Sequence, residues 1–365
     1  MTGKFQLSKF SDIDVADSFF DPLKNDYPED KNNTGFEKWF EKKSRDGATA
    51  LVFTDDDGIG AFVCLKDENE SLILVDEELP SVPRKKISTL RLAERYRGQR
   101  LGEGAIGLAL WQWQKSKQQE IYVTVFEKHD ILIDLLEKFG FEMVGYNPNG
   151  ECVYLKSRGS LDYSDPYKSF PFINPSFEKG GYLIVDDLYH DTLFPYSELA
   201  HTFQDQVALS VANGISKIYV GAQYTPPHYQ VGEPIFIYRR HTKNDGQKPK
   251  YKSCLTSYCV VTDVIMVKTN NRKLMSFEAL CERIGNKSVF DENELRVRYE
   301  NDKNVVVIEL LYYGYFGAGN NINNAWLSDN GYFTGAYPAS IEISPEQFIE
   351  ILREGDVDVS NVIID

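Results

Sequence analysis

Apolar and polar positions in the first half of the chain change period several times, which predicts a mixed series of strands and helices. Residues 36–45 have the spacing of a short amphipathic helix. Residues 48–53 and 60–65 are apolar runs on either side of a turn at residues 55–58, a pattern typical of a β-hairpin. Further strands are predicted at residues 71–75, 86–92, 121–126, 142–146 and 152–155, and further helices at 102–117 and 130–139. This order indicates an α/β domain with a mixed sheet flanked by helices.

The second half is richer in runs of β-branched and aromatic residues, which are typical of strands. Such runs lie at residues 182–185, 218–220, 235–238, 259–267, 305–311 and 340–343. Helical spacing is found at residues 196–211, 277–284 and 345–353. The last helix is expected to begin after Ser344, with Pro345 at its first position and Gln347 completing the cap. This half therefore indicates an α+β fold whose sheet is expected to form a small β-barrel.

The chain has 365 residues, more than the roughly 100–200 residues of a usual single domain, so two domains are expected. Residues 157–170 are rich in turn-forming residues and are typical of a connection between domains. The predicted division is a first domain at 1–157, a linker at 158–181 and a second domain at 182–365.

Composition narrows the classes of function. A formal net charge of −15 disfavours general binding to polyanions, although a local basic patch can still bind nucleic acid. Five cysteines without a C-x-x-C pair predict no disulfide framework or zinc knuckle, and the five histidines do not favour a metal centre, so no metal is predicted. No apolar run is long enough to cross a membrane, and the first 20 residues lack a signal-peptide pattern. We therefore expect a cytoplasmic protein without a membrane partner.

One segment carries a phosphate-binding pattern: the string RGQRLGEG at residues 97–104 lies between a predicted strand and a predicted helix. A helix that follows a strand and a glycine-rich turn presents unpaired backbone N–H groups, and its dipole favours an anion at that end. Glycines allow close approach to the backbone, and arginines can add charge-assisted bonds. The string predicts a phosphate site; the alternative is a solvated basic loop that caps a helix.

This segment resembles the signature Q/R-x-x-G-x-G/A of the GNAT superfamily of acyl-CoA N-acyltransferases, and the resemblance covers most of residues 35–157. The later string IDLLEKFGFEMVG is similar to the family's ending around GF. The resemblance implies acetyl-CoA as the cosubstrate, with a strand at Leu90 and Leu92 that pairs with its pantetheine arm. The residues that would bind the diphosphate are Arg97, Gly98, Gln99, Arg100, Leu101, Gly102 and Gly104. Arg100 departs from the family pattern, which has its first glycine at this position.

The resemblance also implies where catalytic groups should lie. Many members of that family carry a tyrosine in the later helix that protonates the leaving thiolate, and the matching position here is Leu136. Tyr122 and Tyr146 are candidates to replace it. Glu94 and Glu127 are the nearest acidic residues for a general base that acts through water. For each glutamate the alternative is a solvated surface carboxylate.

The pattern of residues 182–355 resembles PUA-like domains of the ASCH or EVE type, small barrels that handle RNA or modified bases. Taken from its residues alone, this half has a basic cluster with interleaved aromatic side chains, a combination that binds single strands or flipped bases. The residues predicted to bind nucleic acid are Tyr238, Arg239, Arg240, Lys243 and Lys250. The alternative is that the rings fill the core and the lysines form a solvated hairpin tip.

Two functions of different class follow from these patterns. The first is an N-acetyltransferase that moves an acetyl group from acetyl-CoA to a primary amine, with the second domain recruiting an RNA or ribonucleoprotein substrate. The second is a catalytically degenerate domain that serves as a ligand sensor or scaffold beside an RNA- or modified-base-binding module. Leu136 favours the second function, whereas the intact strand, turn and helix favour the first. Both functions are compatible with a chain that forms oligomers.

Overall fold

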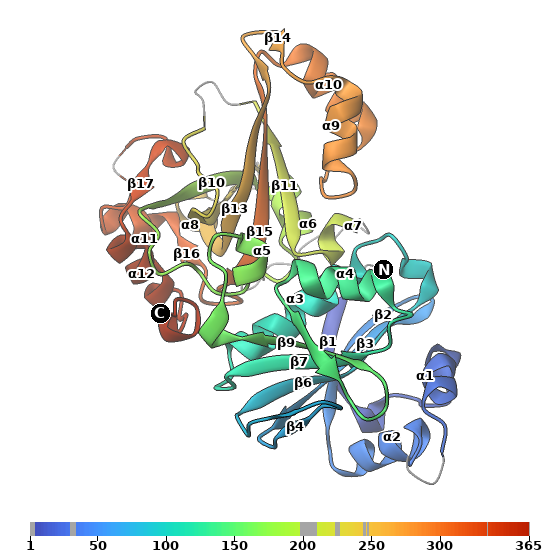
Figure 1. Cartoon of the computed structure of the whole chain (residues 1–365). Coiled ribbons are helices and arrows are strands. Elements are labelled where there is room, and N and C mark those ends of the chain that lie inside the picture. Colours follow the sequence, from blue (N-terminus) through green and yellow to red (C-terminus); the bar gives the residue numbers. More distant parts are fainter. Residues whose placement is uncertain are drawn as a thin grey trace.

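The computed structural model describes residues 4–29, 34–197, 210–222, 227–243, 246, 248–333 and 335–364. Figure 1 shows two halves, each built on a β-sheet, with helices α3 (Leu101–Gln114) and α4 (Asp130–Lys138) between them. The mixed α/β character expected for the first half is confirmed by the order of its elements.

The first sheet has seven strands in the order β1-β2-β3-β6-β7-β9-β8. Its strands are β1 (Lys4–Lys9), β2 (Thr49–Asp55), β3 (Gly58–Glu68), β6 (Arg84–Leu92), β7 (Glu120–Val125), β8 (Glu142–Tyr146) and β9 (Cys152–Ser157). β6 and β7 run parallel, and the other neighbouring strands of this sheet are antiparallel. A short separate pair is formed by β4 (Leu72–Ile73) and β5 (Glu78–Leu79).

Helices cover both faces of the first sheet. On one face, α1 (Asp21–Asp26) and α2 (Phe36–Arg45) pack through a cluster of phenylalanines in which Phe40 lies against Phe62 of β3. On the opposite face, α3 and α4 share a core with the strands, and Ile106 of α3 is fully buried there. The first sheet therefore separates two differently lined surfaces.

The second sheet follows the path β11-β15-β13-β12-β10-β17, with β14 and β16 paired to β13. Its strands are β10 (Gly180–Asp186), β11 (Ser216–Gly221), β12 (Pro234–Arg240), β13 (Cys254–Thr269), β14 (Arg272–Lys273), β15 (Val305–Tyr315), β16 (Ile322–Asn323) and β17 (Glu342–Ile343). The helices of this half are α6 (Asp187–Leu193), α7 (Ser210–Asn213), α8 (Pro249–Lys252), α9 (Phe277–Ile284), α10 (Glu292–Asn301), α11 (Asn324–Asp329) and α12 (Pro345–Glu354).

The closed β-barrel expected for this half is not observed. In the described part of the chain, no pairing joins β11 to β17, so the strands form an open path. β17 has two residues and pairs with β10 at one end of this path.

Most elements predicted from residue spacing are present. α2 and α9 span the expected residues, and α12 begins at Pro345 with the predicted capping box between Ser344 and Gln347. β1 and α10 were not predicted. The helix predicted at residues 196–211 lies mostly outside the described residues, which resume with α7.

The segment predicted as a linker is packed against both halves. It contains α5 (Pro166–Ser169), and the Phe170 side chain that follows is fully buried. The ammonium group of Lys156 on β9 donates hydrogen bonds of 2.6–2.7 Å to the carbonyl oxygens of Phe139, Lys168 and Phe170. The segment therefore joins the two sheets through buried contacts.

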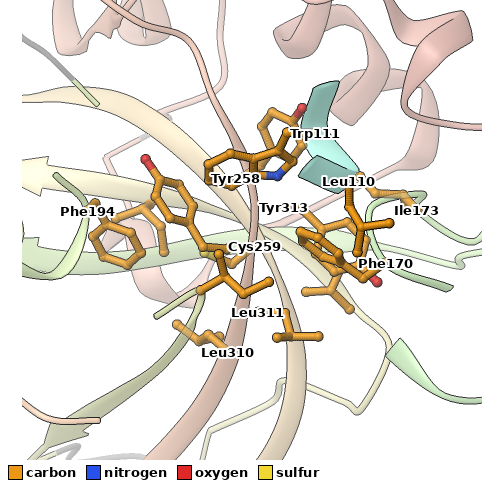
Figure 2. Close-up of a cluster of buried hydrophobic side chains, with 14 of the residues drawn as sticks. Leu110, Trp111, Phe170, Ile173, Phe194, Tyr258, Cys259, Leu310, Leu311 and Tyr313 are labelled. Atoms are coloured by element: carbon orange, nitrogen blue, oxygen red, sulfur yellow. The ribbon is translucent and has the colours of Figure 1, made fainter. Parts of the chain in front are cut away.

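α3 is buried on every side because both halves pack against it. All its residues except Gly102 and Gln112 are buried. Figure 2 shows Trp111 of α3 among side chains of the second half such as Phe194 and Tyr313, and its ring centroid lies 5.3 Å from that of Tyr312. One hydrophobic core therefore runs through both halves.

Candidate functional site

A cleft opens where two parallel strands of the first sheet separate. β6 and β7 are paired from Arg84–Ile87 to Glu120–Val123, and beyond this point β6 continues to Leu92 without β7 beside it. The register between β3 and β6 shifts at Ser88, which is therefore an extra residue in β6. The resulting cleft has a volume of about 910 Å³.

The cleft passes through the sheet from one face to the other. Its lining includes Leu23 and Trp39 from the α1 and α2 face, and Leu101, Gly102 and Leu135 from the α3 and α4 face. The lining therefore comes from both faces of the sheet, and the ends of the cleft at these faces are its α1 mouth and its α3 mouth.

The β6 wall of the cleft presents backbone hydrogen-bonding groups. The N–H of Ala93, which follows β6, donates to the carbonyl oxygen of Gly60 at the β3 side. Since backbone groups along a strand point to alternate sides, those of Leu92 and Leu90 face the cleft. Both residues line the cleft. An extended ligand with amide groups can therefore pair with β6 as a strand would.

The glycine-rich turn stands at the α3 mouth. The N–H of Gln99 donates to the carbonyl oxygen of Tyr96, and Gly98 has a φ of +74°, as a type II turn requires at this position. The first backbone bond of α3 runs from the Gly104 N–H to the Arg100 carbonyl. In the described residues no side chain caps α3, so the N–H groups of residues 100–103 are free to bind an anion.

Most residues predicted to bind the cosubstrate line this cleft: Leu90, Leu92, Arg97, Gly98, Arg100, Leu101 and Gly102. Gln99 and Gly104 are not among the lining residues. A side chain at Gly104 would overlap the carbonyl oxygen of Asn213, so this glycine serves the contact between the halves. A Cβ at Gly102 would instead lie 3.1 Å from the Leu92 side chain, across the cleft.

Arg100, the departure from the family signature, turns its side chain towards the second half. Its φ of +62° is left-handed, the conformation that glycine adopts at no steric cost. Its guanidinium is 2.8 Å from a carboxylate oxygen of Glu103 and donates to the hydroxyl and carbonyl oxygens of Ser216. The Arg100 side chain therefore does not narrow the path to the turn's backbone.

Glu103 is held ionised inside this contact. Burial alone would raise the pKa of its carboxyl group, but the Arg100 guanidinium and hydrogen bonds from Ser216 outweigh burial and lower the pKa below 4.5. The Ser216 N–H donates to the same carboxylate at 2.5 Å. The Arg100 guanidinium and the Glu103 carboxylate thus form a buried ion pair at the junction between the halves.

The cleft carries cations near both mouths. At the α1 side, the Lys128 ammonium is 2.8 Å from a carboxylate oxygen of Asp26. At the α3 side, Lys138 lies 4.2 Å above the Tyr167 ring, and burial lowers the pKa of Lys138. Arg97 is exposed beside the turn. Asp130 and Asp134 of α4 line the same side, so Arg97 and Lys138 place cations beside the turn without giving this mouth a uniformly positive surface.

The predicted catalytic residues are dispersed. Glu94 is exposed and lines the cleft. Tyr122 is buried on β7 and donates to Glu68, while Tyr146 donates to Glu127 at 2.6 Å on the surface. These last residues are not among those that line the cleft. The geometry thus connects Glu94 alone of the predicted set with the cleft.

Leu136, at the position of the family tyrosine, is fully buried in the core. Sequence reasoning did not select Tyr27, whose ring lines the cleft and whose hydroxyl donates to Glu151 at 2.9 Å. It also missed Lys138 and Ser88. Ser88 interrupts the alternation of β6 with a buried hydroxyl that has no partner among the described residues, and this polar residue within a strand was the available signal.

The residues predicted to bind nucleic acid do not form one surface. Arg239 is buried and forms two hydrogen bonds with the carboxylate of Asp191, at 2.9 and 3.0 Å. Tyr238 is buried and accepts from Asn324. Arg240, Lys243 and Lys250 are exposed, and Arg240 pairs with Asp186. Tyr238 and Arg239 therefore belong to the core and are not available to a nucleic acid. Arg240, Lys243 and Lys250 are at the surface, where binding to a nucleic acid stays a prediction.

Comparison with known families agrees with the geometry of the first half. Residues 14–141 match the profile of the acetyltransferase (GNAT) family. The N-terminal half thus contains a GNAT acetyltransferase domain, and the match agrees with acetyl-CoA as the predicted cosubstrate. No curated protein matches the chain. The PUA-like character of the second half stays a prediction.

Solved structures similar to parts of the chain include Arabidopsis thaliana NAA60 in complex with acetyl-CoA, at 15% identity and a TM-score of 0.30, covering 42% of this chain and 97% of that one. An N-acetyltransferase from Staphylococcus aureus is 14% identical, with a TM-score of 0.30 and coverage of 43% and 99%. ZmASCH from Zymomonas mobilis is 11% identical, with a TM-score of 0.31 and coverage of 48% and 96%. TM-scores this low carry no argument about chemistry.

No helix within the described residues combines the length and apolar character needed to span a membrane.

Proposed function

We propose that the chain is an N-acetyltransferase that transfers an acetyl group from acetyl-CoA to a primary amine within the cleft between β6 and β7. The observation that carries this proposal is the cleft itself, which joins free helix N–H groups at one mouth to an opening on the opposite face. When bound, acetyl-CoA supplies a thioester that an amine can attack.

The residues of the cleft fit such a ligand. The free N–H groups at the start of α3 bind its diphosphate, and Gly102 leaves room for close approach. The cleft-facing backbone groups of Leu90 and Leu92 pair with the amides of the pantetheine arm. Because the strands meet again at Ile87, the arm ends near the apex of the cleft, where the opposite mouth opens.

Proton transfer follows from the few polar groups available. Glu94 is the predicted acidic residue at the cleft, but it follows the end of β6 on the diphosphate side, whereas the thioester lies towards the apex at Ile87, so we assign removal of the amine proton to solvent water. As the C–N bond forms, the C–S bond breaks, and the thiolate takes a proton from solvent because Leu136 has none to donate. Orientation between the two strands supplies the rest of the rate enhancement.

A second candidate function rests on Leu136. A domain that binds acetyl-CoA without turnover, as a ligand sensor or scaffold, needs the cleft and the turn but no proton donor. The buried Leu136 side chain agrees with this alternative. Recruitment of an RNA or ribonucleoprotein substrate by the second half is a further proposal, which rests on the exposed Arg240, Lys243 and Lys250.

Calorimetry with acetyl-CoA tests the proposal. The wild type is expected to bind, and Gly102→Glu to weaken binding on the order of 100-fold, because it places bulk and negative charge in the cleft beside the diphosphate. Gly159→Glu is the matched control, since Gly159 is exposed and a side chain there meets only the Ser157 hydroxyl at 3.7 Å.

Thiol release with a panel of amines then separates the two functions. Release that requires an amine supports the transferase, and binding without release supports the sensor or scaffold. Equal affinity of wild type and Gly102→Glu, or no binding by the wild type, would overturn the assignment of the cleft.

A further inference from the structure

Two asparagines of the second half bind the carbonyl oxygens of the glycine-rich turn. The Nδ2 atom of Asn286, in the segment between α9 and α10, donates to the carbonyl oxygen of Gly98 at 2.8 Å. The Nδ2 atom of Asn213, at the end of α7, donates to the carbonyl oxygen of Gln99 at 3.0 Å. The turn is thus contacted from outside its own domain at two successive peptide groups.

Both asparagines are anchored within the second half. The residue after Asn286 accepts a hydrogen bond from the Ile218 N–H on β11 at 3.1 Å. A few residues further on, the Phe290 ring packs on Tyr189 of α6 with centroids 5.0 Å apart. α7, which ends at Asn213, is held to β11 by the Lys217 ammonium group, which donates to the carbonyl oxygen of Val211 at 2.6 Å. The two donors are therefore fixed by contacts that do not involve the turn.

These contacts orient the peptide groups of the turn. A peptide group is planar, and its C=O and N–H point in opposite directions. Holding the Gln99 carbonyl towards Asn213 turns the Arg100 N–H away from the second half, to join the free N–H groups of α3. It also keeps the carbonyl oxygen, which repels anions, from rotating towards a bound diphosphate.

We infer that Asn213 and Asn286 are positioning residues for the diphosphate of an acyl-CoA, so that the anion site of the first half is completed by the second. This inference rests on the proposed function. The two hydrogen bonds make acyl-CoA binding and the docking of the second half mutually dependent, since binding and docking stabilise the same conformation of the turn.

The test is calorimetry of acetyl-CoA binding to the full chain carrying Asn213→Ala and Asn286→Ala together. Each exposed hydrogen bond contributes modestly, so the double variant is expected to bind about fivefold to tenfold more weakly than the wild type. Urea unfolding is measured in parallel, and its midpoint is expected to stay unchanged because both bonds lie at the surface.

Asn301→Ala is the matched control, because Asn301 is exposed at the end of α10 and no hydrogen bond joins it to the turn among the described residues. Asn286→Gln keeps the amide donor and is expected to recover part of the affinity lost in Asn286→Ala. If the wild type binds and the double variant binds equally well, the positioning role is overturned while the proposed function stands. If the wild type itself fails to bind, the proposed function is overturned first.

Discussion

Arg100 shows how one residue can serve two structural purposes. Its backbone takes the left-handed conformation that a glycine normally provides in this turn, while its side chain neutralises the buried Glu103 at the junction of the halves. A left-handed residue with a side chain costs about 1–2 kcal/mol, which the buried contacts of the Arg100 side chain offset. The same residue therefore shapes the glycine-rich turn and secures the domain contact.

Removal of the Arg100 side chain is expected to destabilise the fold. Arg100→Ala leaves the Glu103 carboxylate buried without its partner, which costs about 3–5 kcal/mol. Urea denaturation followed by circular dichroism measures the change. Arg97→Ala, at an exposed arginine of the same turn, serves as the control and should lie near the wild type. Equal stability of the two variants would contradict the role of this ion pair.

The low pKa of Glu103 predicts how the contribution of this contact depends on pH. The folded pKa lies below the ordinary value of 4.5, so the unfolded chain binds more protons in mild acid. The stabilisation is fully present above pH 4.5 and is lost as the pH falls through the lowered folded pKa. The stability advantage of the wild type over Glu103→Gln should shrink as the pH falls below 4.5, as measured by urea denaturation. A constant difference would contradict the assignment.

At the scale of elements, α3 has a different task on each side. Its first turn and Gly102 face the cleft, while Gly104 and Gly107 allow the second half to approach. A helix that is apolar around most of its circumference is expected to be buried, and α3 is buried at all positions except Gly102 and Gln112. The cleft and the domain contact are thus built on one rigid element.

Gly104→Ala tests this division of α3. In an exposed helix this change would stabilise by about 1 kcal/mol. Here the new methyl group would overlap the backbone carbonyl oxygen of Asn213, so the free energy of unfolding is expected to fall by about 1–3 kcal/mol. Gly159→Ala, at an open position, is the control. A stabilised Gly104→Ala variant would show that the halves do not pack closely at this point.

At the scale of the whole molecule, the two halves share one core. Trp111 of α3 packs on Tyr312 of β15, and the buried Phe170 from the connecting segment packs on Tyr313. Neither half can lose its structure without exposing side chains that the other half buries. The chain should therefore behave as one cooperative unit.

Hydrogen exchange in increasing urea tests this cooperativity. The slowest amides of β7 in the first half and of β15 in the second are expected to open with the same free energy and the same dependence on urea. Two clearly different free energies would show that the halves unfold independently, and that the shared core contributes little coupling.

Local chemistry was sufficient to predict much of this protein. The apolar spacing of α2 and α9, the Ser344 cap of α12, and the succession of strand, glycine-rich turn and helix depend on neighbouring residues, and the structure contains them all. The turn predicted free N–H groups where α3 begins, because such groups at a helix start are a local property.

What the tertiary structure decided were contacts between residues far apart in the chain. Gly104 belongs to the domain contact, Arg239 to a buried pair with Asp191, and Tyr238 to the core, although each has the residue type of a surface ligand site. The lining of the cleft by α1 and α2 also depends on long-range packing, because these two helices must cover that face of the sheet. A residue's type sets what it can bind, whereas long-range packing determines whether it faces a ligand, another domain or the core.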